Sequence, residues 1–396
     1  MNAKKNQPAG RARFAHPRPL AIAVALFLAV ALAAPSAEIL GSSALGYGID
    51  LPEGWALADK KGNERYHFTQ ALYGADLQIA IYPANQFQEA TKALSFVASQ
   101  FGSKGNLASL EWRRRKAAIT QLSFAGYGGW AIALELSGGK GWIVLACYTK
   151  EDRATALEPL IVSTLDSIAT DEGSWFEPGP MTAFAYMPEK PITVPFDLGT
   201  GKLDIPFDTV DAEANQSIVD REFSLLTGYL DTPLVYEAWK RYYRLIYRDA
   251  WARFAKASFI VGNELPQKPE ELAAALLSWT QGFTYERNPS GSDFVNLPDS
   301  FASKRGDCDS RAMLMVLMLN QLGVDAILLV SPEYSHAVCA VDCPGKGARY
   351  CFGGKDYLIA DTTAKVGIGL IGEDMADPSK WFAVSFYAFP QKAQGN

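Results

Sequence analysis

Histidine and cysteine, from which many catalytic and metal sites are built, are scarce in this sequence. Its 396 residues include three histidines and five cysteines, and they form no CxxC or HxxxH pattern. Zinc sites normally take several such ligands at short spacings. We therefore predict no metal and no cofactor, and a zinc site stays only an alternative, with ligands drawn from Cys308, His336, Cys339 and Asp361.

Long apolar runs are also scarce. The run Leu20–Ala34 follows five Lys or Arg residues, is too short for a comfortable membrane span, and leads to small residues ending at Ala33 and Ala37. This pattern predicts a signal peptide over residues 1–37 and an exported protein, periplasmic or extracellular. The alternative is an N-terminal membrane anchor that is not cleaved.

Excess positive charge is absent as well. The full chain has a formal net charge of −6, and loss of the five positive charges in residues 1–37 makes it −11. Nucleic-acid binding depends on Lys and Arg at the phosphates, so we predict no nucleic-acid partner. The hydrophobic content of 48% is that of a globular protein, and the length suggests two or three domains.

All five cysteines follow the predicted signal peptide, and export permits disulfides. An odd number leaves at least one thiol unpaired in a monomer. Cys343 and Cys351 flank the turn sequence PGKGA, which we take as a hairpin tip. They form the best candidate pair for a disulfide.

Residues 38–170 alternate strand-like segments with two helical ones, of which Gln86–Phe101 has apolar residues at helical spacing. The order of these elements and the motif LPEGW (Leu51–Trp55) resemble the PsbP/DcrB-like fold. The resemblance implies an antiparallel sheet with helices and a binding role, with a cell-envelope component as the candidate partner. His67 has no cysteine or acidic motif beside it, and we interpret it as a strand residue.

A Pro- and Gly-rich segment, residues 171–210, is predicted to be a linker or an edge hairpin, and residues 211–396 form the last domain. The helix expected at Leu234–Phe259 carries an aromatic stripe and a basic face of Arg241, Arg244 and Arg248. One interpretation is a surface for sugar, membrane or nucleic acid. We favour the other, a core stripe with a solvated face held by the pairs Glu237–Arg241 and Asp249–Arg253.

The stretch KRGDCDSRAMLMVLMLNQLG (304–323) predicts a buried helix with Cys308 in its first turn. Asp307 is the expected N-cap and Gly323 the expected stop. A helix N-terminus lowers the pKa of a thiol, whereas the carboxylates of Asp307 and Asp309 raise it. We expect the helix dipole and an imidazolium partner to prevail.

A thiolate nucleophile needs a base, and His336 is the only histidine in this half of the chain. It lies in an alternating segment that predicts a strand, and YLIADTT predicts a second strand that ends at Asp361. If these strands are neighbours, Asp361 can accept a hydrogen bond from the imidazole and fix its tautomer. The spacing therefore favours a nucleophile, base and orienting acid.

At these residues the chain resembles the transglutaminase-like, papain-related cysteine enzymes, over about Pro269 to Thr363. The resemblance implies that Cys308 is the nucleophile, His336 the base and Asp361 the orienting residue, and GFTY (282–285) is similar to the family too. The family often has Asp-Pro-Thr where this chain has Asp361-Thr362-Thr363, which leaves Asp356 as a second choice. The second oxyanion donor is not identified from the sequence.

The sequence thus predicts an α+β protein: a PsbP/DcrB-like antiparallel sheet with helices, then a transglutaminase-like domain whose helical part packs on an antiparallel sheet. The predicted function is hydrolysis of peptide or isopeptide bonds in a protein or peptide substrate through a Cys308 thioester. The alternative is an inactive relative that binds peptides or acts as a scaffold. Substrate identity, transamidation and oligomeric state are not predicted.

Overall fold

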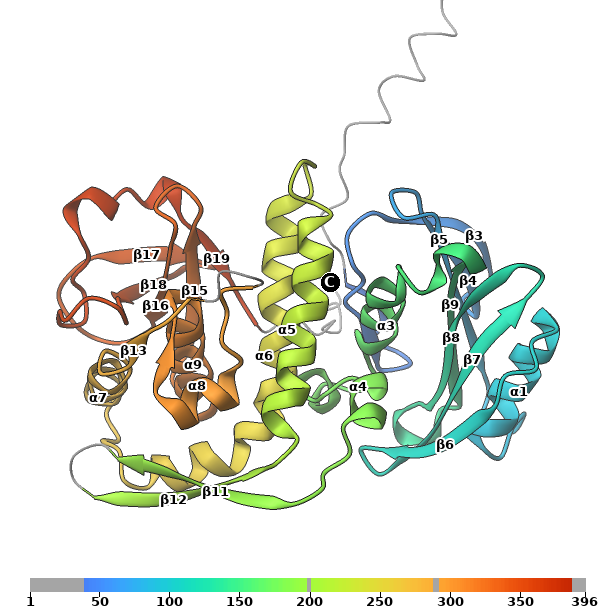
Figure 1. Ribbon diagram of the computed structural model, residues 1–396, viewed down its shortest axis with the longest axis horizontal. Coiled ribbons are helices and arrows are strands. Elements are labelled where there is room, and N and C mark those ends of the chain that lie inside the picture. Colours follow the sequence, from blue (N-terminus) through green and yellow to red (C-terminus); the bar gives the residue numbers. More distant parts are fainter. Residues whose placement is uncertain (1–38, 198–200, 288–291, 387–396) are drawn as a thin grey trace, which may run out of the picture. The chain divides into compact units, whose positions relative to one another are not determined.

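The computed structural model describes residues 39–197, 201–287 and 292–386 (Figure 1). The predicted signal peptide, residues 1–37, lies outside the described residues. Within the described ranges no helix is both long enough and apolar enough to cross a membrane.

The first sheet, here called the N-terminal sheet, is antiparallel throughout and consists of seven strands in the part of the chain that the structure describes (Figure 1). Its strands alternate apolar and polar residues or, in the centre, are apolar on both sides, as expected for a sheet with two covered faces. In spatial order they are β3 (Trp55–Lys61), β4 (Arg65–Gln70), β5 (Ala75–Tyr82), β9 (Trp142–Lys150), β8 (Tyr127–Glu135), β7 (Arg115–Phe124) and β6 (Leu107–Trp112).

Helix α1 (Ala90–Phe101) covers one face of this sheet (Figure 1), where Ala93 and Leu94 share a core with Val144. The opposite face packs on α3 (Glu158–Asp166). A small sheet of β1 (Leu40–Ser42), β2 (Tyr47–Ile49) and β10 (Ile168–Ala169) adjoins that second core, and α2 (Glu151–Ala154) follows β9. The predicted helix near residue 90 is confirmed, and it starts four residues later than expected.

The Pro- and Gly-rich segment contains α4 (Pro180–Ala185) and an antiparallel ribbon of β11 (Pro191–Asp197) and β12 (Lys202–Asp208). Helices α5 (Asp211–Thr227) and α6 (Val235–Gly262) follow and pack on each other. The aromatic stripe of α6 is core as predicted from Tyr243 onward, because Tyr243, Ile246 and Phe254 are buried, but Tyr236 at its start is exposed.

The basic face of α6 is not solvated, and our prediction for it is wrong. Arg241 is 2% exposed and its Nη1 donates to Glu222 Oε2 at 2.6 Å, while Arg244 Nη2 donates to Asp50 Oδ1 at 2.9 Å. The expected pair Asp249–Arg253 does form. Burial of the arginines also contradicts the interpretation of this face as a surface for sugar, membrane or nucleic acid.

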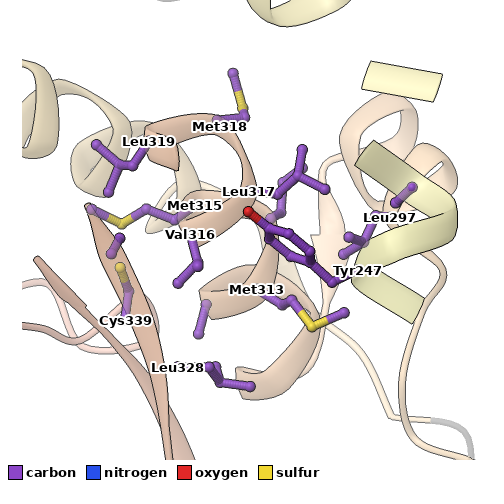
Figure 2. Packing of buried hydrophobic residues seen from close by; sticks show 14 of the residues in the cluster. Tyr247, Leu297, Met313, Met315, Val316, Leu317, Met318, Leu319, Leu328 and Cys339 are labelled. Atoms are coloured by element: carbon purple, nitrogen blue, oxygen red, sulfur yellow. The ribbon is translucent and has the colours of Figure 1, made fainter. Parts of the chain in front are cut away.

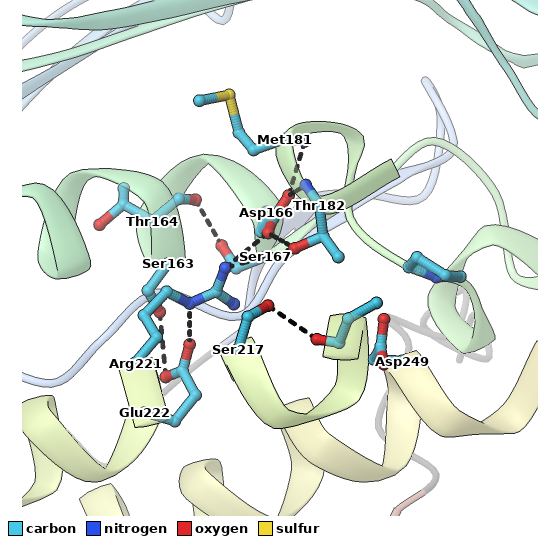
Figure 3. Close-up of polar contacts among 12 residues, drawn as sticks. Ser163, Thr164, Asp166, Ser167, Met181, Thr182, Ser217, Arg221, Glu222 and Asp249 are labelled. Atoms are coloured by element: carbon cyan, nitrogen blue, oxygen red, sulfur yellow. Dashed lines mark hydrogen bonds and ion pairs between the residues drawn. The ribbon is translucent and has the colours of Figure 1, made fainter. Parts of the chain in front are cut away.

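Figure 3 shows how further buried charges join α5 to α3 and α4. Arg221 Nη1 donates to Asp166 Oδ2 at 2.6 Å and its Nε donates to Glu222 Oε1 at 2.8 Å. Asp166 also accepts from the backbone N–H groups of Met181 and Thr182. Each of these charges is paired, which is what makes their burial tolerable.

The second large sheet, here called the C-terminal sheet, is antiparallel with five strands among the described residues. In order they are β17 (Arg349–Phe352), β18 (Lys355–Ala360), β16 (His336–Val341), β15 (Ala326–Ser331) and β19 (Phe382–Val384). Around it lie α7 (Pro269–Thr280), α8 (Leu297–Ser303), α9 (Cys308–Gln321) and the short parallel pair of β13 (Thr284–Tyr285) and β14 (Arg305–Gly306). The predicted α+β class with antiparallel sheets is confirmed.

Helix α9 is buried almost all round, as its sequence predicts. Figure 2 shows Met313, Met315 and Leu317 in a common core with Leu328 and Cys339 of the C-terminal sheet. The Met-rich run therefore belongs to the hydrophobic core. Cys339 belongs to the face of β16 that meets α9.

The predicted disulfide between Cys343 and Cys351 is not formed, and both thiols are free. The sequence suggested that these residues flank a hairpin tip. In the structure β18 lies between the strand that leads to Cys343 and the strand that carries Cys351. Two strand spacings of about 4.8 Å exceed the Cα separation of about 7 Å that a disulfide can span.

Candidate active site

Cys308 is the first residue of α9, and the residues before it fix that position. Asp307 is the N-cap, as predicted, and its Oδ1 accepts from Ser310 N at 2.9 Å and from Ser310 Oγ at 2.6 Å. Gly306 has φ +154°, and a Cβ there would lie 2.9 Å from Ser310 Cβ. The close approach of these backbone segments therefore requires glycine.

His336 begins β16, and Asp361 directly follows β18, the strand that pairs with β16. His336 Nε2 lies 3.2 Å from Asp361 Oδ2. Because Asp361 engages Nε2, Nδ1 is the ring nitrogen left for proton exchange with a reacting group. The structure thus brings together the predicted base and its predicted orienting acid.

Asp361 is held by several donors besides the imidazole. Its Oδ1 accepts from Thr363 N at 2.9 Å and from Thr363 Oγ1 at 2.8 Å. Burial by itself raises the pKa of Asp361, but the hydrogen bonds from His336 and Thr363 outweigh it and lower that pKa to about 2. Asp361 is therefore ionised at neutral pH and accepts the hydrogen bond that orients the ring of His336.

Cys308 and His336 line the same pocket, which has a volume of about 340 Å³. Aromatic side chains form part of its wall, with Trp239 and Tyr242 from α6 and Phe294 from the segment before α8, and polar residues such as Asp293 form another part. The backbone of Ala337, the residue after His336, acts on Cys308 to lower the pKa of its thiol. Cys308 therefore lies near the start of β16.

The thiol of Cys308 is neutral in this arrangement, which contradicts our expectation of a lowered pKa. Its side chain is buried, and Sγ–H donates to Asp309 Oδ1 at 3.1 Å. Burial, and then the charges of Asp309 and Asp307, raise the pKa of Cys308 above its ordinary value. The helix dipole and the Ala337 N–H do not offset these effects, because desolvation of a thiolate costs more than a few partial charges return.

Tyr243 and Trp239 were not predicted to be site residues. Tyr243, which we assigned to the core stripe of α6, donates its hydroxyl to Asp309 Oδ2, and Trp239 Nε1 donates to Tyr243 OH at 3.1 Å. Burial raises the pKa of Asp309, and the hydrogen bonds from Tyr243 and Cys308 reduce that rise. A tyrosine in a buried stripe is a weak signal of such a role, because its hydroxyl usually needs a polar partner.

Arg311 supports the backbone segment that precedes Cys308. Its Nε donates to Gly306 O at 2.9 Å, two residues before Cys308, and its guanidinium carbon lies 5.4 Å from the centre of the Tyr285 ring. Gln281 Nε2 donates to Asp361 O at 2.9 Å. These contacts hold the backbone next to Cys308 and at Asp361 to the surrounding elements.

The other candidates lie apart from this pocket. Asp356, the second choice for the orienting acid, is exposed on β18 opposite Cys351. His67 lies in the N-terminal sheet, where its Nε2 is 2.8 Å from Asp76 Oδ1. No group of three or more His, Cys, Asp or Glu side chains in the described ranges is placed to hold a metal ion, so the zinc alternative gains no geometric support.

Comparison with known proteins gives distant structural likenesses alone. No family model matches the sequence, and no curated protein matches it significantly. The solution structure of cyanobacterial PsbP (CyanoP) from Synechocystis sp. PCC 6803 is 17% identical, with a TM-score of 0.27 over 34% of this chain and 91% of that one. A crystal structure from Bacteroides thetaiotaomicron is 11% identical, with a TM-score of 0.21 over 78% and 88% of the two chains.

The crystal structure of red sea bream transglutaminase is also similar, at 9% identity and a TM-score of 0.18. The match covers 76% of this chain and 48% of the transglutaminase. None of the three scores is high enough to carry an argument about fold family or activity. What can be said of the chemistry rests on the pocket that Cys308 and His336 line and on the contact between His336 and Asp361.

Proposed function

We propose that the chain is an exported cysteine enzyme of acyl transfer that hydrolyses a peptide or isopeptide bond. One observation carries the proposal. The thiol of Cys308, at the start of a buried helix, lines the same pocket as His336, whose imidazole is held by an ionised Asp361. A nucleophile, a base and an orienting acid are the groups that acyl transfer through a thioester needs.

In the proposed reaction His336 Nδ1 takes the proton of Cys308 as the sulfur attacks the carbonyl carbon. The tetrahedral intermediate collapses when the imidazolium returns that proton to the leaving amine, which leaves a thioester on Cys308. Water, deprotonated by His336, then attacks the thioester, releasing a carboxylic acid and the thiol. Hydrolysis is preferred to transamidation because it needs no second substrate site.

The oxyanion of each tetrahedral intermediate needs hydrogen-bond donors. The carboxylate of Asp307 accepts a hydrogen bond from the Ser310 N–H, and its carbonyl oxygen accepts one from the Arg311 N–H. These two N–H groups are therefore already occupied. The first turn of a helix leaves its remaining N–H groups without an intrahelical acceptor. We propose the N–H groups of Cys308 and Asp309 as the donors.

The chemistry requires the thiol to leave its hydrogen bond with Asp309 and pass its proton to His336. The same contact favours a second candidate function, that of an inactive relative that binds peptides in the pocket without turnover. In either case residues 38–170 are proposed to hold a partner from the cell envelope.

An acyl-trapping experiment separates the two. The protein is incubated with a peptide thioester probe, and intact mass is measured for the wild type, for Cys308→Ala and for Cys339→Ala as a buried-cysteine control. The enzyme proposal expects an acyl adduct in the wild type and in Cys339→Ala but not in Cys308→Ala. An adduct that survives in Cys308→Ala, or that is absent from all three, would contradict it.

A further inference from the structure

A second hollow of about 540 Å³ lies on the N-terminal sheet, on the face covered by α1. Here it is called the β3–β4 groove. It is lined by residues between Asp59 and Val144, whereas the pocket of Cys308 is lined by residues between Phe223 and His336. The groove is therefore separate from the proposed active site.

The pairing of the strands determines which side chains face the groove. Lys61 is directly opposite Arg65, Arg65 is opposite Ala80, and Ala80 is opposite Val144. Directly opposite residues of an antiparallel pair lie on the same face of a sheet, and Val144 belongs to the core under α1. Lys61 and Arg65 therefore project from the α1 face, beyond the part of it that α1 covers.

The guanidinium of Arg65 is held in place before any ligand arrives. Its Nη1 donates to Ile81 O at 2.7 Å and to Glu64 O at 2.8 Å. Its guanidinium carbon lies 4.2 Å from the centre of the Tyr82 ring. A cation fixed in this way loses little conformational freedom when it binds an anion.

The charges of Lys61 and Arg65 are not balanced by a carboxylate. In the part of the chain that the structure describes, neither side chain forms an ion pair. Asp59, which also lines the groove, is paired in the sheet with His67 and not with Arg65. Like charges directly opposite each other on a sheet are destabilising. An anion between them would turn a repulsive pair into an attractive site.

An apolar wall stands next to these cations. Val97 and Phe101 of α1 and Tyr82 of β5 line the groove, and Gln100 adds a polar side chain. Phe101 is partly buried against Phe124 and Tyr148. The groove, which Lys60 also lines, thus places Lys61 and Arg65 beside a surface suited to a flat apolar group.

We propose that the β3–β4 groove binds a small organic anion whose phosphate or carboxylate group lies between Lys61 and Arg65 and whose apolar body lies against Val97 and Phe101. The cationic pair, the fixed guanidinium and the adjoining wall each supply one part of this recognition.

Isothermal titration calorimetry on the full mature chain tests the site with four probes: phenyl phosphate, benzoate, inorganic phosphate and benzyl alcohol. We expect phenyl phosphate or benzoate to bind, inorganic phosphate to bind more weakly because it lacks the ring, and benzyl alcohol not to bind. Whichever of phenyl phosphate and benzoate binds with the higher affinity shows whether the head group is a phosphate or a carboxylate. Equal binding of benzyl alcohol and the anions would overturn the proposal, as would no binding of either ring-bearing anion.

Variants locate the binding. Removing one charged donor should weaken the anion about tenfold or more in Arg65→Gln and in Lys61→Gln. Lys92→Gln is the matched control, because Lys92 is an exposed lysine of α1 that does not line the groove. Lys61 is exposed, so its variant should fold even if Arg65→Gln does not. Affinity that is unchanged in Lys61→Gln would refute the placement.

Discussion

Burial and, after it, the charge of Asp309 hold the thiol of Cys308 in its neutral form, and the substitution Asp309→Asn tests the second effect. The asparagine keeps the size of the side chain and removes its charge. The Cys308 Sγ to Asp309 Oδ1 distance is 3.1 Å. Two unit charges about 4 Å apart interact by about 4 kcal/mol at an effective dielectric constant of about 20.

That figure is an upper limit for Asp309, because Tyr243 also donates to its carboxylate and because the asparagine keeps a dipole beside the thiol. If about a third of the interaction is lost in Asp309→Asn, about 1.4 kcal/mol, the thiolate population at pH 7 rises about tenfold. A less basic thiolate is also a weaker nucleophile, by about half of the change on a logarithmic scale. The alkylation rate at pH 7 should therefore rise about threefold.

The assay is the rate of iodoacetamide labelling of Cys308 between pH 5 and 10, followed by peptide mass spectrometry. We expect a faster reaction at pH 7 in Asp309→Asn and an unchanged rate in Asp356→Asn, a control at an exposed acid outside the pocket. A rate in Asp309→Asn equal to that of the wild type, or slower, would refute the reasoning, and a slower rate would indicate that Asp309 itself takes the proton.

Three further predictions concern stability. The pKa of Asp361 is lowered to about 2 in the folded chain from an ordinary 3.8, so its ionisation stabilises the fold by about 2 kcal/mol above pH 4, and this is lost as the pH falls toward 2; urea unfolding of Asp361→Asn should lack that part of the pH dependence. Arg241→Met should cost about 3–5 kcal/mol because it leaves Glu222 buried without that partner, whereas Lys240→Met, which breaks the half-buried pair with Glu237, should cost under about 1 kcal/mol in the same assay. Cys351→Ser should change the unfolding free energy by less than about 0.5 kcal/mol, since a loss of about 2–5 kcal/mol is expected only if Cys351 is in a disulfide.

Local patterns predicted the elements that carry the site. The N-cap at Asp307 and the apolar run after Arg311 define α9, because capping and burial are properties of neighbouring residues. The strand that ends at Asp361 was predicted in the same way. The approach of His336 and Asp361 followed from the simple expectation that the two strands are neighbours.

The failures have one physical origin, which is contact between residues far apart in the chain. The sequence gives the charge of Arg241 but not the fact that Glu222 and Asp50 surround it. It gives the dipole acting on Cys308 but not the depth of its burial, and desolvation is the larger effect. Likewise, the insertion of β18 between two strands that are consecutive in the chain decided the question of the disulfide.

The buried arginines of α6 have a practical consequence for dividing this chain. A fragment that began at residue 211 would keep Arg244 and Arg248 but lose Asp50, the carbonyl oxygens of Ser167 and Trp175, and the ring of Trp175 beneath Arg248. Its newly uncovered surface would carry cations with no counter-charge next to apolar side chains. Such a fragment should be poorly soluble when expressed alone. The N-terminal piece, left with an unpaired Asp50, should be poorly soluble as well.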